Sequence, residues 1–210
     1  ILGPVLEREV ERRAGAVELV KLDVDANPAI ANAFGIQGIP AVKGFRDGRV
    51  VAEFVGAQPA ASVGRFLDSL LPSRAEILAH RGDEDSLRQA VELEPGRTDA
   101  ALPLARILHA RGQHQEALDV LSGVHGSFAA DGLAARIRLE ISSVPDLDAA
   151  FAALDAGNHE RALDLLISAI KPARRDRDDI RRVVVAVLDK LGLDDPLATT
   201  SRARLASALY

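Results

Sequence analysis

The sequence predicts an α/β domain over residues 1–71 followed by an all-α domain over residues 72–210. The first prediction depends on short apolar segments separated by turn residues, two of which flank Asp47-Gly48, a strong hairpin signal. The second depends on the composition after Pro72, where strand signals end and Ala, Leu and Arg dominate with helical spacing. A short motif that occurs twice in this second part also predicts a helical repeat.

The first part begins with an expected order of helix, strand and helix. Residues 4–13 carry apolar side chains on one helical face, and Gly15 is expected to end that helix. Residues 17–24 alternate loosely and predict a buried strand. Asp25 is expected to cap a short helix over residues 29–34.

The first part continues with an expected hairpin and a last helix. Residues 41–45 and 49–54 predict two antiparallel strands joined at Asp47-Gly48. Pro59 begins a helix whose apolar positions follow helical spacing. These positions are Val63, Phe66, Leu67, Leu70 and Leu71.

Several short motifs of this first part resemble those of thioredoxins and occur in the same order. They are Lys21-Leu22-Asp23-Val24-Asp25, Asn27-Pro28, Phe34-Gly35-Ile36, Gly38-Ile39-Pro40, Phe45-Arg46-Asp47-Gly48 and Val55-Gly56. The segment over residues 1–71 therefore looks like the C-terminal two thirds of a thioredoxin domain. Its most specific element is Ile39-Pro40, which falls where thioredoxins hold a cis-proline opposite their redox dipeptide.

The resemblance implies that Ile39 and Pro40 form a cis-proline loop that presents backbone groups to an extended polypeptide. The alternative is a turn with only a structural role, and Ala41 stands where thioredoxins usually have Thr. In thioredoxins, the central strand and the Cys-x-x-Cys turn precede the helix that begins near Ile1. We therefore expect this chain to be part of a longer product that supplies the central strand.

The second part contains two matching segments, Gly112-Gln113-His114-Gln115-Glu116-Ala117-Leu118 and Gly157-Asn158-His159-Glu160-Arg161-Ala162-Leu163. Both have the glycine of a tight corner and the small alanine of a close helix pair, a pattern typical of tetratricopeptide repeats. A third, degenerate unit is predicted over residues 75–95 and an additional segment over residues 132–141. Helices over residues 178–191 and 196–209 are expected to cap the stack.

The whole arrangement, together with the ending Asp195-Pro196-Leu197 and Arg204-Leu205-Ala206-Ser207-Ala208-Leu209-Tyr210, is similar to bacterial YbbN-type proteins, the chaperedoxins. This resemblance implies a cytoplasmic, holdase-type chaperone or co-chaperone. Such a protein binds unfolded or oxidised clients and passes them to other chaperones, without enzymatic turnover.

Composition excludes several other classes of function. The chain has no cysteine, so its own residues supply no disulfide, thiolate metal site or dithiol chemistry. No apolar run approaches the roughly 20 residues that span a bilayer. The net charge of -5 and its even spread argue against nucleic acid as a partner. One basic cluster comprises Arg174, Arg175, Arg177, Arg181 and Arg182. Because Asp176, Asp178 and Asp179 lie among these arginines, we expect a solvated, ion-paired helix start.

The histidines offer no recognisable metal motif. They are His80, His109, His114, His125 and His159. No His-Glu-x-x-His segment or repeated acidic spacing accompanies them, so they are interpreted as surface and turn residues. The sequence therefore predicts no catalytic residue, no metal ligand and no cofactor.

Three functions from different classes are consistent with these observations. The leading hypothesis is a non-enzymatic binding protein for unfolded polypeptides. The alternative is a thiol-disulfide oxidoreductase whose dithiol lies upstream of Ile1. A third is an assembly scaffold with a single stoichiometric partner.

Overall fold

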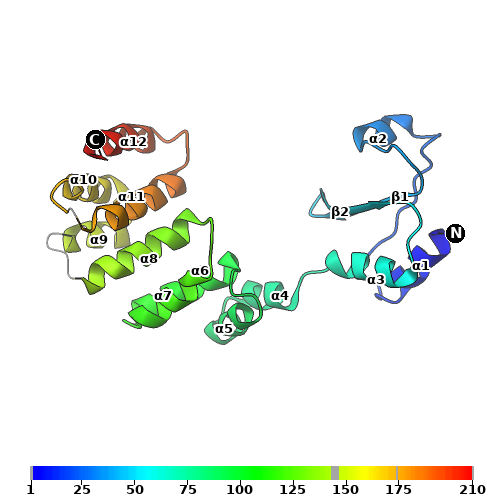
Figure 1. Cartoon of the computed structure of the whole chain (residues 1–210), viewed down its shortest axis with the longest axis horizontal. Helices are drawn as coiled ribbons and strands as arrows, with labels where there is room; N and C mark the ends of the chain where they lie inside the picture. The colour runs from blue at the N-terminus through cyan, green and yellow to red at the C-terminus, as the bar shows by residue number, and fades with distance from the viewer. Residues whose placement is uncertain (1, 143–146, 174, 210) are drawn as a thin grey trace. The chain divides into compact units, whose positions relative to one another are not determined.

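A computed structural model describes residues 2–142, 147–173 and 175–209. The chain divides into two compact units, Ile1–Ser73 and Arg74–Tyr210, here called the N-terminal unit and the helical unit (Figure 1). In the described part of the chain, no helix has both the length and the apolar character needed to cross a membrane.

The N-terminal unit contains helices and one strand pair. Its described elements are α1 (Gly3–Glu11), α2 (Pro28–Ala33), β1 (Ala41–Arg46), β2 (Arg49–Val55) and α3 (Ala60–Ser69). Its small core forms where α1 packs against α3 and buries Leu2, Leu6, Val63 and Leu67. Phe54 of β2 contacts this core, and its ring meets that of Phe66 edge to face at a centroid distance of 4.9 Å.

The predicted hairpin is confirmed. β1 pairs with β2 in antiparallel register, from Ala41 opposite Val55 to Arg46 opposite Arg49. Asp47 and Gly48 both have positive φ, +51° and +76°, as the two central residues of a type I′ turn require.

Two expectations for the N-terminal unit are wrong. Residues 17–24 form no strand, because an extended segment needs a neighbouring backbone to complete its hydrogen bonds and the described residues supply none. Asp25 does not cap α2, which has Asn27 at its N-cap position. Instead, the Asp23 carboxylate accepts hydrogen bonds from the Asp25 and Ala26 N–H groups at 2.9 and 3.2 Å and closes the preceding turn.

The helical unit consists of α-helices joined by short turns. Its described helices are α4 (Arg74–Arg81), α5 (Glu84–Leu93), α6 (Thr98–Ala110), α7 (His114–Ser122), α8 (Phe128–Ile141), α9 (Asp148–Asp155), α10 (His159–Ala169), α11 (Arg177–Leu191) and α12 (Pro196–Leu209).

The three expected corners are present as the turns α4–α5, α6–α7 and α9–α10. Each turns at a glycine with positive φ: +75° at Gly82, +75° at Gly112 and +72° at Gly157. Each of the two motif corners also contains an equivalent backbone hydrogen bond. The Gln113 N–H donates to the Leu108 carbonyl at 2.9 Å, and the Asn158 N–H donates to the Ala153 carbonyl at 2.8 Å. The sequence repeat therefore corresponds to a structural repeat.

The predicted additional segment over residues 132–141 belongs to α8, which links two cores. Ala130 and Ile137 of this helix pack into the cluster formed with α4–α7, whereas Ala135 and Leu139 pack into the cluster of α9–α12. The helix expected over residues 178–191 does not cap the stack. It is α11, an internal helix that packs against α8, α10 and α12.

Candidate functional site

The loop before β1 places Ile39 and Pro40, the two candidate binding residues, at the surface. Their peptide bond is cis, the isomer that the thioredoxin resemblance implies. Pro40 is exposed, and Ile39 keeps 75% of its surface accessible to solvent. The Pro40 carbonyl accepts a hydrogen bond from the Gly56 N–H at 2.8 Å, which fixes this loop to the end of β2.

The strand that follows this loop has one edge without a partner strand in the described residues, because β1 pairs only with β2. In an antiparallel pair, every second residue directs its N–H and C=O groups away from the partner strand. The hydrogen bond from the Gly56 N–H to the Pro40 carbonyl shows that Pro40 faces β2, so the next residue, Ala41, faces away. The backbone groups of Ala41 and Lys43 therefore point away from β2. We call this side of the strand, with Ile39 and Pro40 at its start, the β1 edge.

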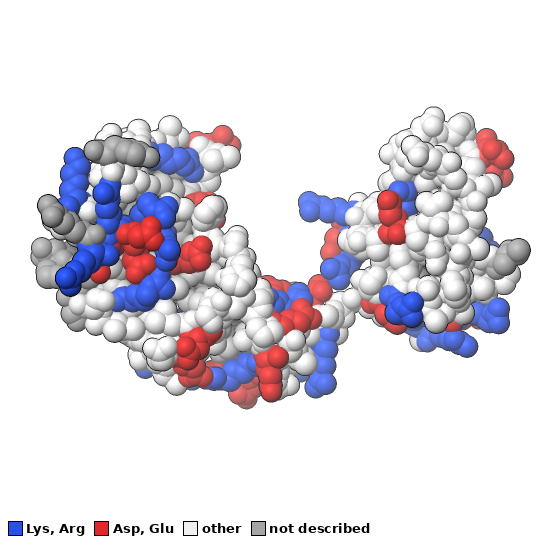
Figure 2. Space-filling view, in the orientation of Figure 1, with Lys and Arg blue, Asp and Glu red and all other residues white. Residues whose placement is uncertain are grey.

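Several large apolar side chains of the N-terminal unit are exposed to solvent. The rings of Phe34 and Phe45 meet edge to face at a centroid distance of 5.4 Å, yet they keep 41% and 49% of their surface exposed. Figure 2 shows that the surface over α2 carries few charged groups, whereas charged groups lie over the strands. A large exposed apolar surface is typical of an interaction site. The exposed large apolar residues of this unit are Val20, Leu22, Ile30, Phe34, Ile39, Phe45, Val50, Val51 and Val55.

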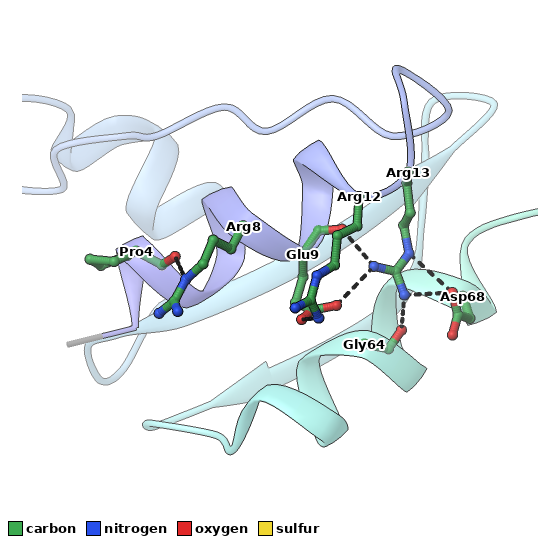
Figure 3. Close-up of polar contacts among 7 residues, drawn as sticks. All are labelled: Pro4, Arg8, Glu9, Arg12, Arg13, Gly64 and Asp68. Atoms are coloured by element: carbon green, nitrogen blue, oxygen red, sulfur yellow. Dashed lines mark hydrogen bonds and ion pairs between the residues drawn. The ribbon is translucent and has the colours of Figure 1, made fainter.

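A polar network on the other side of this unit holds α1 on α3 (Figure 3). The Arg13 guanidinium, 12% exposed, donates to the Gly64 carbonyl at 2.8 Å, to the Asp68 carboxylate at 2.6 Å and to the Glu9 carbonyl at 2.6 Å. Arg12 pairs with the buried Glu9 carboxylate at 2.7 Å. The bonds to Asp68 and Glu9 raise the pKa of Arg13 against the opposing effect of its burial. This network stabilises the two helices whose core supports the hairpin.

The helical unit has a groove of about 420 Å³ between α10 and α12. Apolar, hydroxyl and basic side chains line it, and Arg204 at its rim pairs with Asp164 at 2.5 Å. The lining residues are Ile167, Ser168, Lys171, Ala203, Arg204, Ser207 and Ala208.

Two of the histidines lie in an environment that the sequence did not predict. His109 and His114 are partly buried, and the His109 Nε2 atom lies 2.5 Å from a carboxylate oxygen of Glu140. Glu140 belongs to a helix 31 residues away in sequence, so no local spacing could have indicated this contact. His80 and His125 are exposed, as expected of surface residues.

Two arginines of the cluster at the start of α11 are ion-paired. Arg181 and Arg182 contact Asp178 at 2.7 and 2.8 Å, and Asp179 holds Arg138 of α8 at 2.6 Å. Arg177 instead donates a hydrogen bond to the Leu209 carbonyl. Arg174, a member of the predicted cluster, lies outside the described residues. The charges of Arg181 and Arg182 are therefore balanced locally.

Comparison with known proteins agrees with this architecture. Residues 1–69 match the thioredoxin family, and residues 145–210 match a tetratricopeptide repeat family. An uncharacterised protein of Mycobacterium tuberculosis is 28% identical over 93% of this chain and 69% of its own length. Thioredoxin C-2 of Corynebacterium nephridii is 42% identical over 32% of this chain and 62% of its own length. A thioredoxin of Chlorobaculum thiosulfatiphilum is 38% identical over 32% and 63%.

The chain is thus a thioredoxin-like domain followed by a helical region of tetratricopeptide repeats. Its two parts combine a thioredoxin fold with repeats of a type that mediates protein–protein contacts.

Proposed function

We propose that this protein is a holdase-type chaperone or co-chaperone of the chaperedoxin kind. It binds unfolded or oxidised polypeptides at the Ile39-Pro40 loop and through its repeats in the bacterial cytoplasm, without nucleotide hydrolysis or enzymatic turnover. The observation that carries this proposal is the exposed Ile39-Pro40 loop, with its cis peptide bond and the exposed apolar side chains near it.

Main-chain pairing is the binding mode that this loop supports. The exposed backbone groups of Ile39 can pair with any extended backbone, so affinity comes from the main chain and not from a particular sequence. A protein that must accept many unfolded clients needs this kind of sequence tolerance.

Exposed apolar side chains near the loop suit the same clients. Unfolded polypeptides expose apolar side chains, and Ile39, Phe45 and Val55 keep 75%, 49% and 64% of their surfaces accessible in the N-terminal unit. Burying this surface against apolar client residues contributes roughly 25 cal/mol per Å².

The repeats supply a second surface for protein contacts. The groove between α10 and α12 lies within the residues that match the tetratricopeptide repeat family. We propose that it contacts client segments or other chaperones. Two weak contacts on one chain reinforce each other, because the second contact forms at a high effective concentration.

Suppression of client aggregation tests the holdase proposal directly. The readout is suppression of light scattering by thermally denatured citrate synthase under reducing conditions without nucleotide, together with direct titration of a labelled unfolded client. Absence of any suppression by the wild-type chain in molar excess would refute the holdase proposal.

A charge introduced into the loop tests the apolar part of this proposal. Ile39→Asp should weaken client binding, since it places a carboxylate where apolar client residues are expected to pack. Leu193→Asp is the matched control, because Leu193 is 81% exposed but lies in the helical unit away from the groove residues. Equal effects of the two substitutions would show that general surface hydrophobicity, rather than this loop, attracts clients.

The second candidate is a thiol-disulfide oxidoreductase, which similarity to the two thioredoxins favours. Because these 210 residues contain no cysteine, this activity would need a dithiol elsewhere in the protein. Reduction of insulin by the intact protein, and its loss in a Cys→Ser form, would support this candidate.

A further inference from the structure

Three potential metal ligands from separate helices meet in the helical unit, at a place that the proposed function does not use. His109 lies in the last turn of α6, His114 is the first residue of α7, and Glu140 lies in the last turn of α8. One ligand atom from each lies within 4.8 Å of the others. The two imidazole rings have a centroid distance of 5.5 Å, and His109 Nε2 lies 2.5 Å from Glu140 Oε2.

These distances are close to those of a bound Zn²⁺ ion. Ligand atoms about 2.0–2.2 Å from zinc in tetrahedral arrangement lie roughly 3.3–3.5 Å from one another. To bind zinc, the distance between His109 Nε2 and Glu140 Oε2 would increase slightly. Rotation of the His114 side chain would bring its ligand atom closer to the other two. Two imidazoles and one carboxylate are also a ligand set that zinc accepts, with the fourth position left to water.

Glu140 is held by contacts that leave one of its oxygens available to a cation. Its Oε1 atom accepts a hydrogen bond from Arg136 at 2.7 Å, whereas Oε2 faces His109. Arg136 in turn makes two hydrogen bonds to Asp155, at 2.7 and 2.8 Å. Supporting bonds of this kind orient ligands in metal sites and are part of their affinity.

The local charge balance also favours a divalent cation. The single charge of Arg136 is offset by Asp155 and Glu140, so with neutral histidines the group carries about one net negative charge. His109 and Glu140 have side chains only 17% and 20% exposed, which limits competition from solvent.

We propose that His109, His114 and Glu140 form a site for a divalent transition metal ion, with Zn²⁺ as the best fit. The ion joins the α6–α7 corner to the end of α8, and it therefore fixes one repeat unit to the helix that links the two cores. The role is structural or regulatory and is independent of client binding at the Ile39-Pro40 loop.

The test is metal titration of the full chain after chelator treatment and dialysis. Zn²⁺ binding is followed by calorimetry, and Co²⁺ binding is followed by its visible absorption, which reports tetrahedral coordination. We expect one equivalent per chain, and displacement of Co²⁺ by Zn²⁺. Absence of stoichiometric binding by the wild-type chain would overturn the proposal.

Substitutions locate the site. His109→Gln still donates a hydrogen bond to Glu140 but removes a metal ligand, and His114→Gln removes the second. Each should weaken Zn²⁺ binding by at least about 100-fold, more than the loss of a supporting contact causes. His125→Gln is the matched control because His125 is exposed and is not one of the three clustered groups. Equal affinity of all three variants would place the metal elsewhere and overturn the assignment.

A second measurement covers variants that fold poorly. Zn²⁺ should raise the thermal unfolding midpoint of the wild-type and His125→Gln chains but leave that of His114→Gln unchanged. An equal increase in all of them would contradict the proposed ligands.

Discussion

Gly132 of α8 lies directly against Ala186 of α11, so that a Cβ atom built on Gly132 would stand 2.2 Å from the Cβ atom of Ala186. Only glycine permits this approach, and α8 and α11 cross closely because of it. We predict that Gly132→Ala destabilises the helical unit, because the overlap costs roughly 1–3 kcal/mol and exceeds the gain in helix propensity. Urea unfolding followed by far-ultraviolet circular dichroism measures the change.

Gly64 of α3 supplies the control for this prediction. A Cβ atom built there meets no atom closer than 3.5 Å, so Gly64→Ala should be neutral or stabilise by up to about 1 kcal/mol. The double variant Gly132→Ala with Ala186→Gly should recover part of the lost stability, since it restores one small residue at the crossing. Destabilisation that persists unchanged in the double variant would mean that the close contact is not its cause.

We expect that lysine cannot replace Arg13 without loss of stability of the N-terminal unit. Lysine at this position cannot reach the Gly64 carbonyl, the Asp68 carboxylate and Glu9 at once, because it lacks the planar fork of donors. We predict that Arg13→Lys lowers the free energy of unfolding of the N-terminal unit by about 1–3 kcal/mol. Asp68→Asn should cost less than about 1 kcal/mol, since the Asp68 side chain is 65% exposed. Equal losses in the two variants would contradict this account of the network.

The Asp83 cap of α5 predicts a defined pH dependence. Hydrogen bonding from the Ser86 N–H at 2.9 Å lowers the pKa of Asp83 below its ordinary value of 3.8. Its contribution to stability is therefore complete above pH 3.8 and is lost as the pH falls through the lower folded-state pKa. Asp83→Asn keeps a capping side chain that does not titrate, whereas Asp83→Ala removes the cap.

The measurement is the thermal unfolding midpoint of the wild type and of the two Asp83 variants at several pH values between strongly acidic and neutral conditions. The wild-type midpoint should exceed that of Asp83→Ala near neutrality. The difference between wild type and Asp83→Asn should become less favourable to wild type at acidic pH. A difference that does not change with pH would exclude titration of Asp83 as its source.

The sequence predicted the elements whose causes are local. Asp47-Gly48 specifies its turn because two adjacent residues can adopt positive φ, and Gly112 and Gly157 specify their corners for the same reason. The segment over residues 17–24 was predicted wrongly because a strand is defined by its neighbour as well as by its own residues. The side chains of α11 have an apolar pattern that would suit either a cap or an internal helix, so their position could not be predicted.

The candidate sites divide in the same way. Ile39 and Pro40 were found because their motif is contiguous, and the structure places them at the surface beside β1. The proximity of His109 and Glu140 could not be predicted, since it depends on how α6 and α8 pack. The bonds by which Arg136 connects Glu140 to Asp155 could not be predicted either, because Asp155 lies 19 residues away on another helix.

The central claim, client binding at the Ile39-Pro40 loop, is tested most directly by residue-resolved amide hydrogen exchange. The full chain is compared with and without reduced, carboxymethylated α-lactalbumin, which is a permanently unfolded client. The account predicts slower exchange of the Gly38 and Ile39 amides when the client is bound. Unchanged exchange at these two amides, with protection confined to the helical unit, would contradict it.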